Sequence, residues 1–90
     1  MLYLVIEHFK NGDAVPVYRR FRDRGRMTPD GLDYVSSWVD FRLERCYQIM
    51  ETSYPELIEQ WIENWSDLVD FEIIPVMPSD VARQSVESKL

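Results

Sequence analysis

Two glutamates, Glu7 and Glu72, are the residues of this chain best suited to acid–base chemistry. If they lie close together in a semi-enclosed site, each carboxylate raises the pKa of the other, which leaves one of them as a general acid or base. The alternative is a structural role, either as hydrated residues at the rim of the site or as partners of arginines across a dimer interface. The sequence leaves both interpretations open.

Five further residues are candidates for a ligand pocket beside these glutamates. Trp38 and Tyr3 would form an aromatic wall, and Gln48 would orient a ligand by a hydrogen bond. The remaining two candidates, Cys46 and Met50, would pack as apolar side chains. This composition indicates a small, partly aromatic ligand.

The sequence predicts neither a metal nor a cofactor. Its one histidine, His8, and its one cysteine, Cys46, do not supply a usual set of zinc ligands. We expect strand alternation to place these two residues on opposite faces of a sheet, which argues against a catalytic Cys–His pair. The chain also lacks a phosphate-binding loop, a dinucleotide-binding glycine pattern, and the HExxH and GxSxG motifs.

The charge distribution argues against a nucleic-acid partner. The net charge is −6, yet residues 10–26 hold six basic and two acidic residues. We interpret these arginines as the solvated face of a helix that pairs with an acidic second helix. An RNA-recognition domain would also need aromatic side chains and a basic-glycine motif on its third strand, which residues 45–52 lack.

The longest apolar run argues against a membrane span. MLYLVI at 1–6 is far shorter than the roughly 20 residues that a span needs, and no signal peptide is evident. A lone cysteine is typical of a reducing compartment, so we expect a cytoplasmic protein.

Hydrophobic periodicity predicts six elements. Strands are expected at 1–9, 32–40, 45–52 and 70–77, with Pro75 indicating a sheet edge. A helix is expected at 14–25, with Asp13 as its N-cap and Gly25 as its C-cap. A second helix should follow a cap at Thr52 or Ser53, because Ile58, Trp61, Ile62 and Trp65 repeat at helical spacing.

This order predicts an α+β, ferredoxin-like βαββαβ fold. Its four-stranded antiparallel sheet would run 4-1-3-2, with both helices on one face. Residues 1–77 would form the domain, and residues 78–90 a polar tail that is at most a short helix capped by Ser79.

Strand alternation divides the sheet residues into two sets. We expect an apolar set to face the helices: Leu2, Leu4, Ile6, Val35, Val39, Tyr47, Ile49, Phe71 and Ile73. A mixed set would lie on the other face: Tyr3, Val5, Glu7, Tyr34, Ser36, Trp38, Cys46, Gln48, Met50, Glu72, Ile74 and Val76. Because the mixed set is too apolar to be exposed to solvent, we expect a sheet-to-sheet homodimer that encloses this face as an interface or a lined pocket.

The sequence contains five characteristic stretches: YLVIEHFKNGD, VYRRFRDRGR, LDYVSSWVD, RCYQIMET and WIENWSDLVDFEIIPV. As a set they resemble a bacterial family of short proteins known only as a domain of unknown function. The resemblance covers residues 1–77 and implies a dimeric α+β barrel. Cofactor-free quinone-forming monooxygenases, muconolactone isomerases and several small-molecule-binding proteins share that arrangement. The family offers no catalytic residues to carry over. A bacterial resemblance also makes the peroxisome-like ending Ser88-Lys89-Leu90 coincidental.

Three functions remain open at this point. The leading hypothesis is a small homodimer with a pocket for a small, partly aromatic molecule. The second is a cofactor-free monooxygenase or isomerase that uses Glu7 or Glu72 as its base. The third is a structural or protein-interaction module without a ligand.

Overall fold

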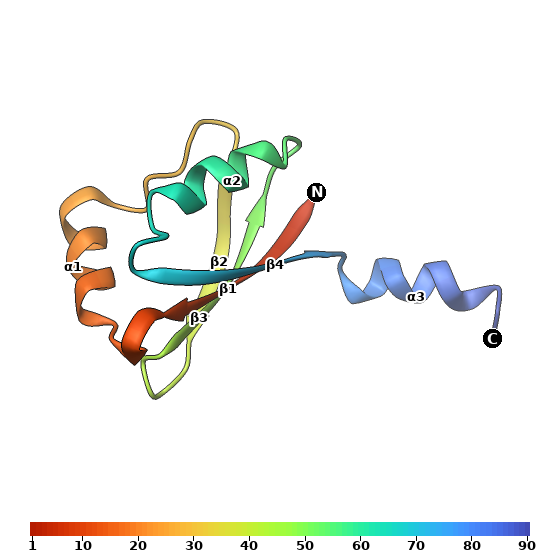
Figure 1. Ribbon diagram of the computed structural model, residues 1–90. Coiled ribbons are helices and arrows are strands. Elements are labelled where there is room, and N and C mark those ends of the chain that lie inside the picture. The colour runs from red at the N-terminus through yellow and green to blue at the C-terminus, as the bar shows by residue number, and fades with distance from the viewer.

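The computed structural model describes residues 1–90 as four strands and three α-helices (Figure 1). In chain order these are β1 (Leu2–Phe9), a short 3₁₀ turn (Lys10–Gly12), α1 (Val15–Arg24), β2 (Asp33–Val39), β3 (Arg45–Glu51), α2 (Glu56–Glu63), β4 (Val69–Val76) and α3 (Ser79–Glu87). Each predicted strand and both predicted main helices are present, with ends shifted by a few residues.

The four strands form one antiparallel sheet in the order β2-β3-β1-β4. This order is the predicted 4-1-3-2 arrangement read from the other edge, so the ferredoxin-like fold is confirmed. The strand that contains Pro75, β4, lies at an edge of the sheet. An edge strand pairs with one neighbour only, so it tolerates a residue that has no backbone N–H.

The predicted C-cap of α1, Gly25, is confirmed, whereas its predicted N-cap, Asp13, lies one residue too early. The Val15 N–H donates to Asp13 Oδ1 at 3.0 Å, so Asp13 supports the first turn from one residue before the N-cap position, Ala14. Gly25 ends the helix with a φ of 69°, and its N–H donates to the Phe21 carbonyl oxygen at 2.7 Å. A positive φ of this kind favours glycine because it has no Cβ.

The predicted caps of the other helices are wrong. Thr52 Oγ1 accepts a hydrogen bond from the Tyr54 N–H at 3.0 Å, but α2 begins later, at Glu56, with Pro55 at its N-cap. Pro78 stands at the N-cap of α3, and Ser79 is the first residue inside that helix. None of the three helices has the length and hydrophobicity that a membrane span requires.

The prediction of which sheet residues face the helices is wrong for β1 and β3. The mixed set is the buried one: Tyr3 and Val5 of β1 and Met50 of β3 are at most 6% exposed. They form one core cluster with Trp61 of α2 and Val17 of α1. Both alternating sets of β1 contain large apolar residues, so alternation alone did not identify the buried set, and a one-residue difference exchanges the two faces.

The apolar members of β1 and β3 therefore lie on the side of the sheet away from α1 and α2. We call this side the open face, and strand pairing aligns its residues across the sheet. The apolar residues of the open face, from all four strands, are half-buried or exposed: Leu4, Ile6, Trp38, Tyr47, Ile49, Ile74 and Val76.

The C-terminal helix α3 extends away from the rest of the chain (Figure 1). It has no buried residues, and its apolar side chains Val81 and Val86 are 43% and 46% exposed. The predicted short helix in the tail is thus present, but nothing in the same chain covers it.

Candidate functional site

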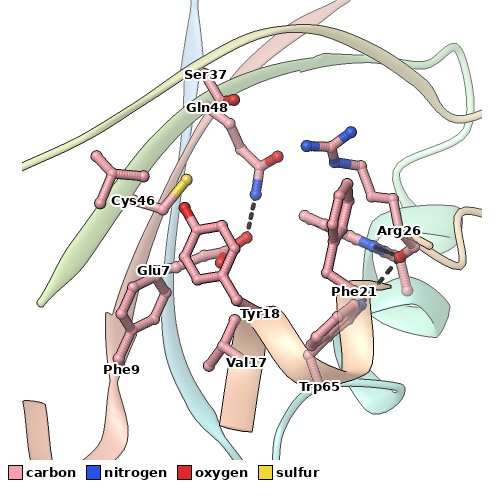
Figure 2. Close-up of a pocket in the computed structure, with 12 residues that line it drawn as sticks. Glu7, Phe9, Val17, Tyr18, Phe21, Arg26, Ser37, Cys46, Gln48 and Trp65 are labelled. Carbon is pink, nitrogen blue, oxygen red and sulfur yellow. Dashed lines mark hydrogen bonds between the residues drawn. The ribbon is translucent and has the colours of Figure 1, made fainter. Parts of the chain in front are cut away.

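A cavity of about 190 Å³ lies between the sheet and the helices (Figure 2). Eight of its twelve lining residues are hydrophobic, and aromatic rings make up much of the wall. The lining residues are Glu7, Phe9, Val17, Tyr18, Phe21, Arg26, Ser37, Val39, Cys46, Gln48, Trp61 and Trp65.

Strand pairing brings the polar residues of the cavity together. Glu7 lies directly opposite Cys46, and the neighbouring pair on the same face joins Val5 to Gln48. Ser37 of β2 lies opposite Gln48 on the other side of β3. The cavity therefore has a polar wall made by three adjacent strands.

The helices provide the aromatic part of the cavity. Tyr18 and Phe21 of α1 lie over the sheet, and the Tyr18 ring meets the Phe9 ring edge-on with 6.4 Å between centroids. Tyr18 and Phe21 are nonetheless 48% and 41% exposed.

Arg26 is held at the cavity by residues of α2 and the turn that follows it. The indole N–H groups of Trp61 and Trp65 both donate to the Arg26 carbonyl oxygen at 3.0 Å. The Arg26 guanidinium lies 3.7 Å from the centroid of the Tyr34 ring, and no carboxylate lies within ion-pair distance of it. A cation thus stands over an aromatic ring at the cavity without a charged partner.

Glu7 is the buried carboxyl group of the site, with 9% of its surface exposed. Burial raises its pKa from 4.5 to about 7, because a carboxylate loses its hydration there, and the positive charge of Arg26 opposes the rise. The Gln48 Nε2 group donates a hydrogen bond to the Glu7 carboxylate. This carboxyl therefore exchanges a proton near neutral pH, as a general acid or base does.

Gln48 carries an unpaired acceptor. It is 2% exposed, and its amide oxygen, Oε1, is buried without a hydrogen-bond partner. A buried polar atom without a partner costs about 1–3 kcal/mol, so such atoms are rare in folded proteins. Gln48 itself lines the cavity, so its unpaired oxygen lies beside that space.

Cys46 contributes an apolar wall to the site. Burial, together with a smaller contribution from the negative charge of Glu7, raises the pKa of its thiol to about 12. The thiol is therefore protonated at neutral pH and is a poor nucleophile.

The structure separates the residues that the sequence analysis grouped. Three candidates, Glu7, Cys46 and Gln48, line the cavity. Tyr3 and Met50 are buried in the core and do not line it.

The two other candidates, Trp38 and Glu72, lie on the open face. Glu72 pairs with Ile6 and its Oε1 lies 3.1 Å from His8 Nε2. The prediction that both glutamates lie on the same face of the sheet is therefore wrong. His8 and Cys46 do lie on opposite faces, as predicted.

Sequence reasoning missed the aromatic and cationic parts of the cavity. Tyr18, Phe21, Trp61 and Trp65 belong to the apolar stripes of the two helices, and a stripe indicates burial without indicating an unfilled space. Arg26 follows the glycine that ends α1, and its position depends on the two tryptophans that bind its carbonyl oxygen.

Charge pairing between the helical segments is present at one site. The Arg20 guanidinium of α1 donates to both carboxylate oxygens of Asp67, each at 2.7 Å, and this contact lowers the pKa of Asp67 to about 2. The structure contains no cluster of three or more His, Cys, Asp or Glu side chains that could hold a metal ion.

A four-stranded antiparallel sheet covered on one face by α1 and α2 places this chain among the ferredoxin-like α+β proteins. The chain belongs to the family described as Domain of unknown function (DUF3303), whose model matches residues 1–90. The match confirms the resemblance to a domain of unknown function and includes the C-terminal tail. No curated protein and no solved structure matches the chain significantly.

Proposed function

We propose that this protein binds a small, partly aromatic molecule in the cavity between its sheet and helices. The observation that carries the proposal is the buried Gln48 amide oxygen, which has no partner and lies at the wall of an aromatic-lined space. A ligand that donates a hydrogen bond to this oxygen would remove the cost of the unpaired acceptor. Its apolar body would contact the rings of Tyr18, Phe21 and Trp65.

A pair of adjacent serines gives a matched test. Ser37 lines the cavity opposite Gln48, whereas Ser36 lies opposite Ile49 on the open face. We expect ring-containing fragments with a hydroxyl group to shift the backbone amide NMR signals of the cavity residues in the wild type. Ser37→Leu should weaken this binding at least about tenfold by filling the cavity, and Ser36→Leu should leave it unchanged. Equal binding by both variants would place the ligand elsewhere.

A second candidate function is that of a cofactor-free monooxygenase or isomerase with Glu7 as its base. It is favoured by the buried position of Glu7 and by its pKa of about 7, which suits proton abstraction from a weakly acidic ligand. Turnover of a bound ligand should then fall at least about a hundredfold in Glu7→Gln. Unchanged turnover would remove Glu7 from the mechanism. Glu72 lies on the other face and serves as the control.

We also propose a homodimer through the open face. Four strands of seven or eight residues, at ~3.3 Å per residue and ~4.8 Å between strands, give this face a footprint of about 500 Å². The exposed apolar side chains of α3 would extend it toward the ~800 Å² per partner of a stable interface. A second copy is the fitting occupant, because one apolar patch covers itself in a two-fold dimer.

Two exposed apolar residues allow this dimer to be tested. Ile74 on the open face is 42% exposed, and Val15 at the start of α1 is 59% exposed. Ile74→Glu should raise the dissociation constant of the dimer at least about a hundredfold in sedimentation equilibrium, whereas Val15→Glu should not change it. A wild type that stays monomeric would contradict the dimer.

A further inference from the structure

The hydrogen-bonded pair of Glu7 and Gln48 defines the chemistry that the cavity presents to a ligand. Both side chains are buried, both line the cavity, and the pair joins two adjacent strands. The following inference rests on the proposed binding function and specifies the polar group of the ligand.

When Glu7 is ionised, the orientation of the Gln48 amide is fixed. A carboxylate only accepts hydrogen bonds, so the amide nitrogen must face it. The amide oxygen is then left on the other side, where it has no partner. Figure 2 shows this oxygen on the side of the amide that faces Arg26 across the cavity. In this state the polar wall offers an acceptor.

When Glu7 is protonated, the preferred orientation reverses. A neutral carboxyl group carries an O–H donor, and an amide oxygen is its best acceptor. A half-turn about the last side-chain bond of Gln48 exchanges its oxygen and nitrogen positions, and such terminal torsions are soft. The NH₂ group then faces the cavity, so the polar wall offers a donor.

The other ionisable groups around Glu7 keep the same protonation state while Glu7 gains or loses its proton. Cys46 lies opposite it on β3, Tyr18 faces it from α1, and Arg26 faces it from the turn after α1. Burial raises the pKa values of the Cys46 thiol and the Tyr18 hydroxyl, so both stay neutral, and the guanidinium stays charged. Glu7 is thus the group of the cavity that titrates near neutral pH.

We propose that the proton on Glu7 selects the class of ligand through the orientation of the Gln48 amide. With Glu7 ionised, the cavity takes a ring-containing molecule that donates a hydrogen bond, such as a phenol or an enol. With Glu7 protonated, it takes a molecule of the same shape that accepts one, such as an aromatic ketone.

The ligand-free protein provides the first arm of the test. We expect the carboxyl carbon of Glu7 and the side-chain amide nitrogen of Gln48 to titrate together in NMR spectra, with one midpoint near neutral pH. The amides of Gln60 and Gln84 are exposed and serve as internal controls that should not titrate. Glu7→Gln should abolish the change at Gln48. A Gln48 amide that stays constant while Glu7 titrates would overturn the switch.

Two probes of equal size provide the second arm. 4-Ethylphenol carries a donor and stays neutral over the range, whereas acetophenone carries only an acceptor. The affinity ratio of phenol to ketone should rise at least about tenfold between about pH 5.5 and pH 8.5. The ratio should stay constant in Glu7→Gln.

The two arms separate the switch from the binding function. A ratio that does not depend on pH, with both probes bound, would overturn the switch and leave ligand binding intact. If neither probe binds while Gln48 follows Glu7, the proposed binding of such ligands fails and the ligand selection fails with it, and only the reorientation of the amide remains.

Discussion

Replacing Glu7 with glutamine should make the protein more stable, and the gain should depend on pH. The folded protein raises the pKa of Glu7 from 4.5 to about 7, so folding favours the protonated carboxyl. Below about pH 4.5 the carboxyl is protonated in both states and adds no cost. As the pH rises from 4.5 to about 7, the unfolded chain releases the proton that the folded protein still holds, so stability falls, and it levels off above about pH 7.

The size of this effect follows from the shift. A shift from 4.5 to about 7, at about 1.4 kcal/mol per pKa unit, corresponds to about 3 kcal/mol above pH 7. Glutamine has nearly the same shape and carries no charge, so Glu7→Gln should recover most of this lost free energy of unfolding. For a domain of this size, the melting temperature should rise by roughly 10–20 °C at alkaline pH.

Urea unfolding followed by tryptophan fluorescence measures this difference directly. Wild type and variant are compared at about pH 4.5 and about pH 8.5 at one fixed protein concentration, because a dimer would make stability depend on concentration. Glu63→Gln is the matched control, since Glu63 is exposed at the end of α2 and forms no ion pair. Its effect should stay within about 0.5 kcal/mol at both pH values. A Glu7→Gln effect that is equal at both pH values would refute the argument that Glu7 is desolvated.

Two substitutions test the fold that holds the site. Gly25→Ala should cost about 1–2 kcal/mol in urea unfolding through the positive φ of 69° alone, because no atom lies within 4 Å of the new Cβ; a neutral effect would mean that the helix end adjusts. Met50→Ala should cost about 2–5 kcal/mol because Met50 is 0% exposed, whereas Met77→Ala, at 58% exposure, should be nearly neutral. Equal losses in the two methionine variants would contradict the packing of β3 against the helices.

The order of elements was predictable from sequence, but the direction in which β1 faces was not. Helical spacing at Ile58, Trp61 and Trp65 and the turn at Gly25 are local signals, and they placed α1 and α2 within a few residues of their observed positions. In β1, however, Leu4 and Val5 are equally apolar neighbours that point to opposite faces. Which of them is buried depends on pairing with β3 and β4, which the sequence does not record.

The same ambiguity explains why the candidate site was only partly predicted. Glu7 and Gln48 were expected together and do lie together, because they belong to the same face of adjacent strands. Glu72 was expected beside them on the assumption that it aligns with Glu7. In the structure Phe71 takes that place, which turns Glu72 toward His8 on the open face.

A buried carboxyl that weakens the fold needs a reason to be there. An apolar residue at position 7 would pack between Phe71 and Cys46 without the cost of about 3 kcal/mol at alkaline pH. The hydrogen bond from the Gln48 amide does not remove this cost, because the pKa of Glu7 stays at about 7, and Gln48 adds the cost of its own unpaired oxygen. A buried carboxyl with a raised pKa and a buried amide oxygen without a partner, both in residues that line one aromatic cavity, are difficult to explain as packing, because each would be replaced at a gain in stability. They are explained if a ligand completes their hydrogen bonds, and this is the physical argument for a binding site in this cavity.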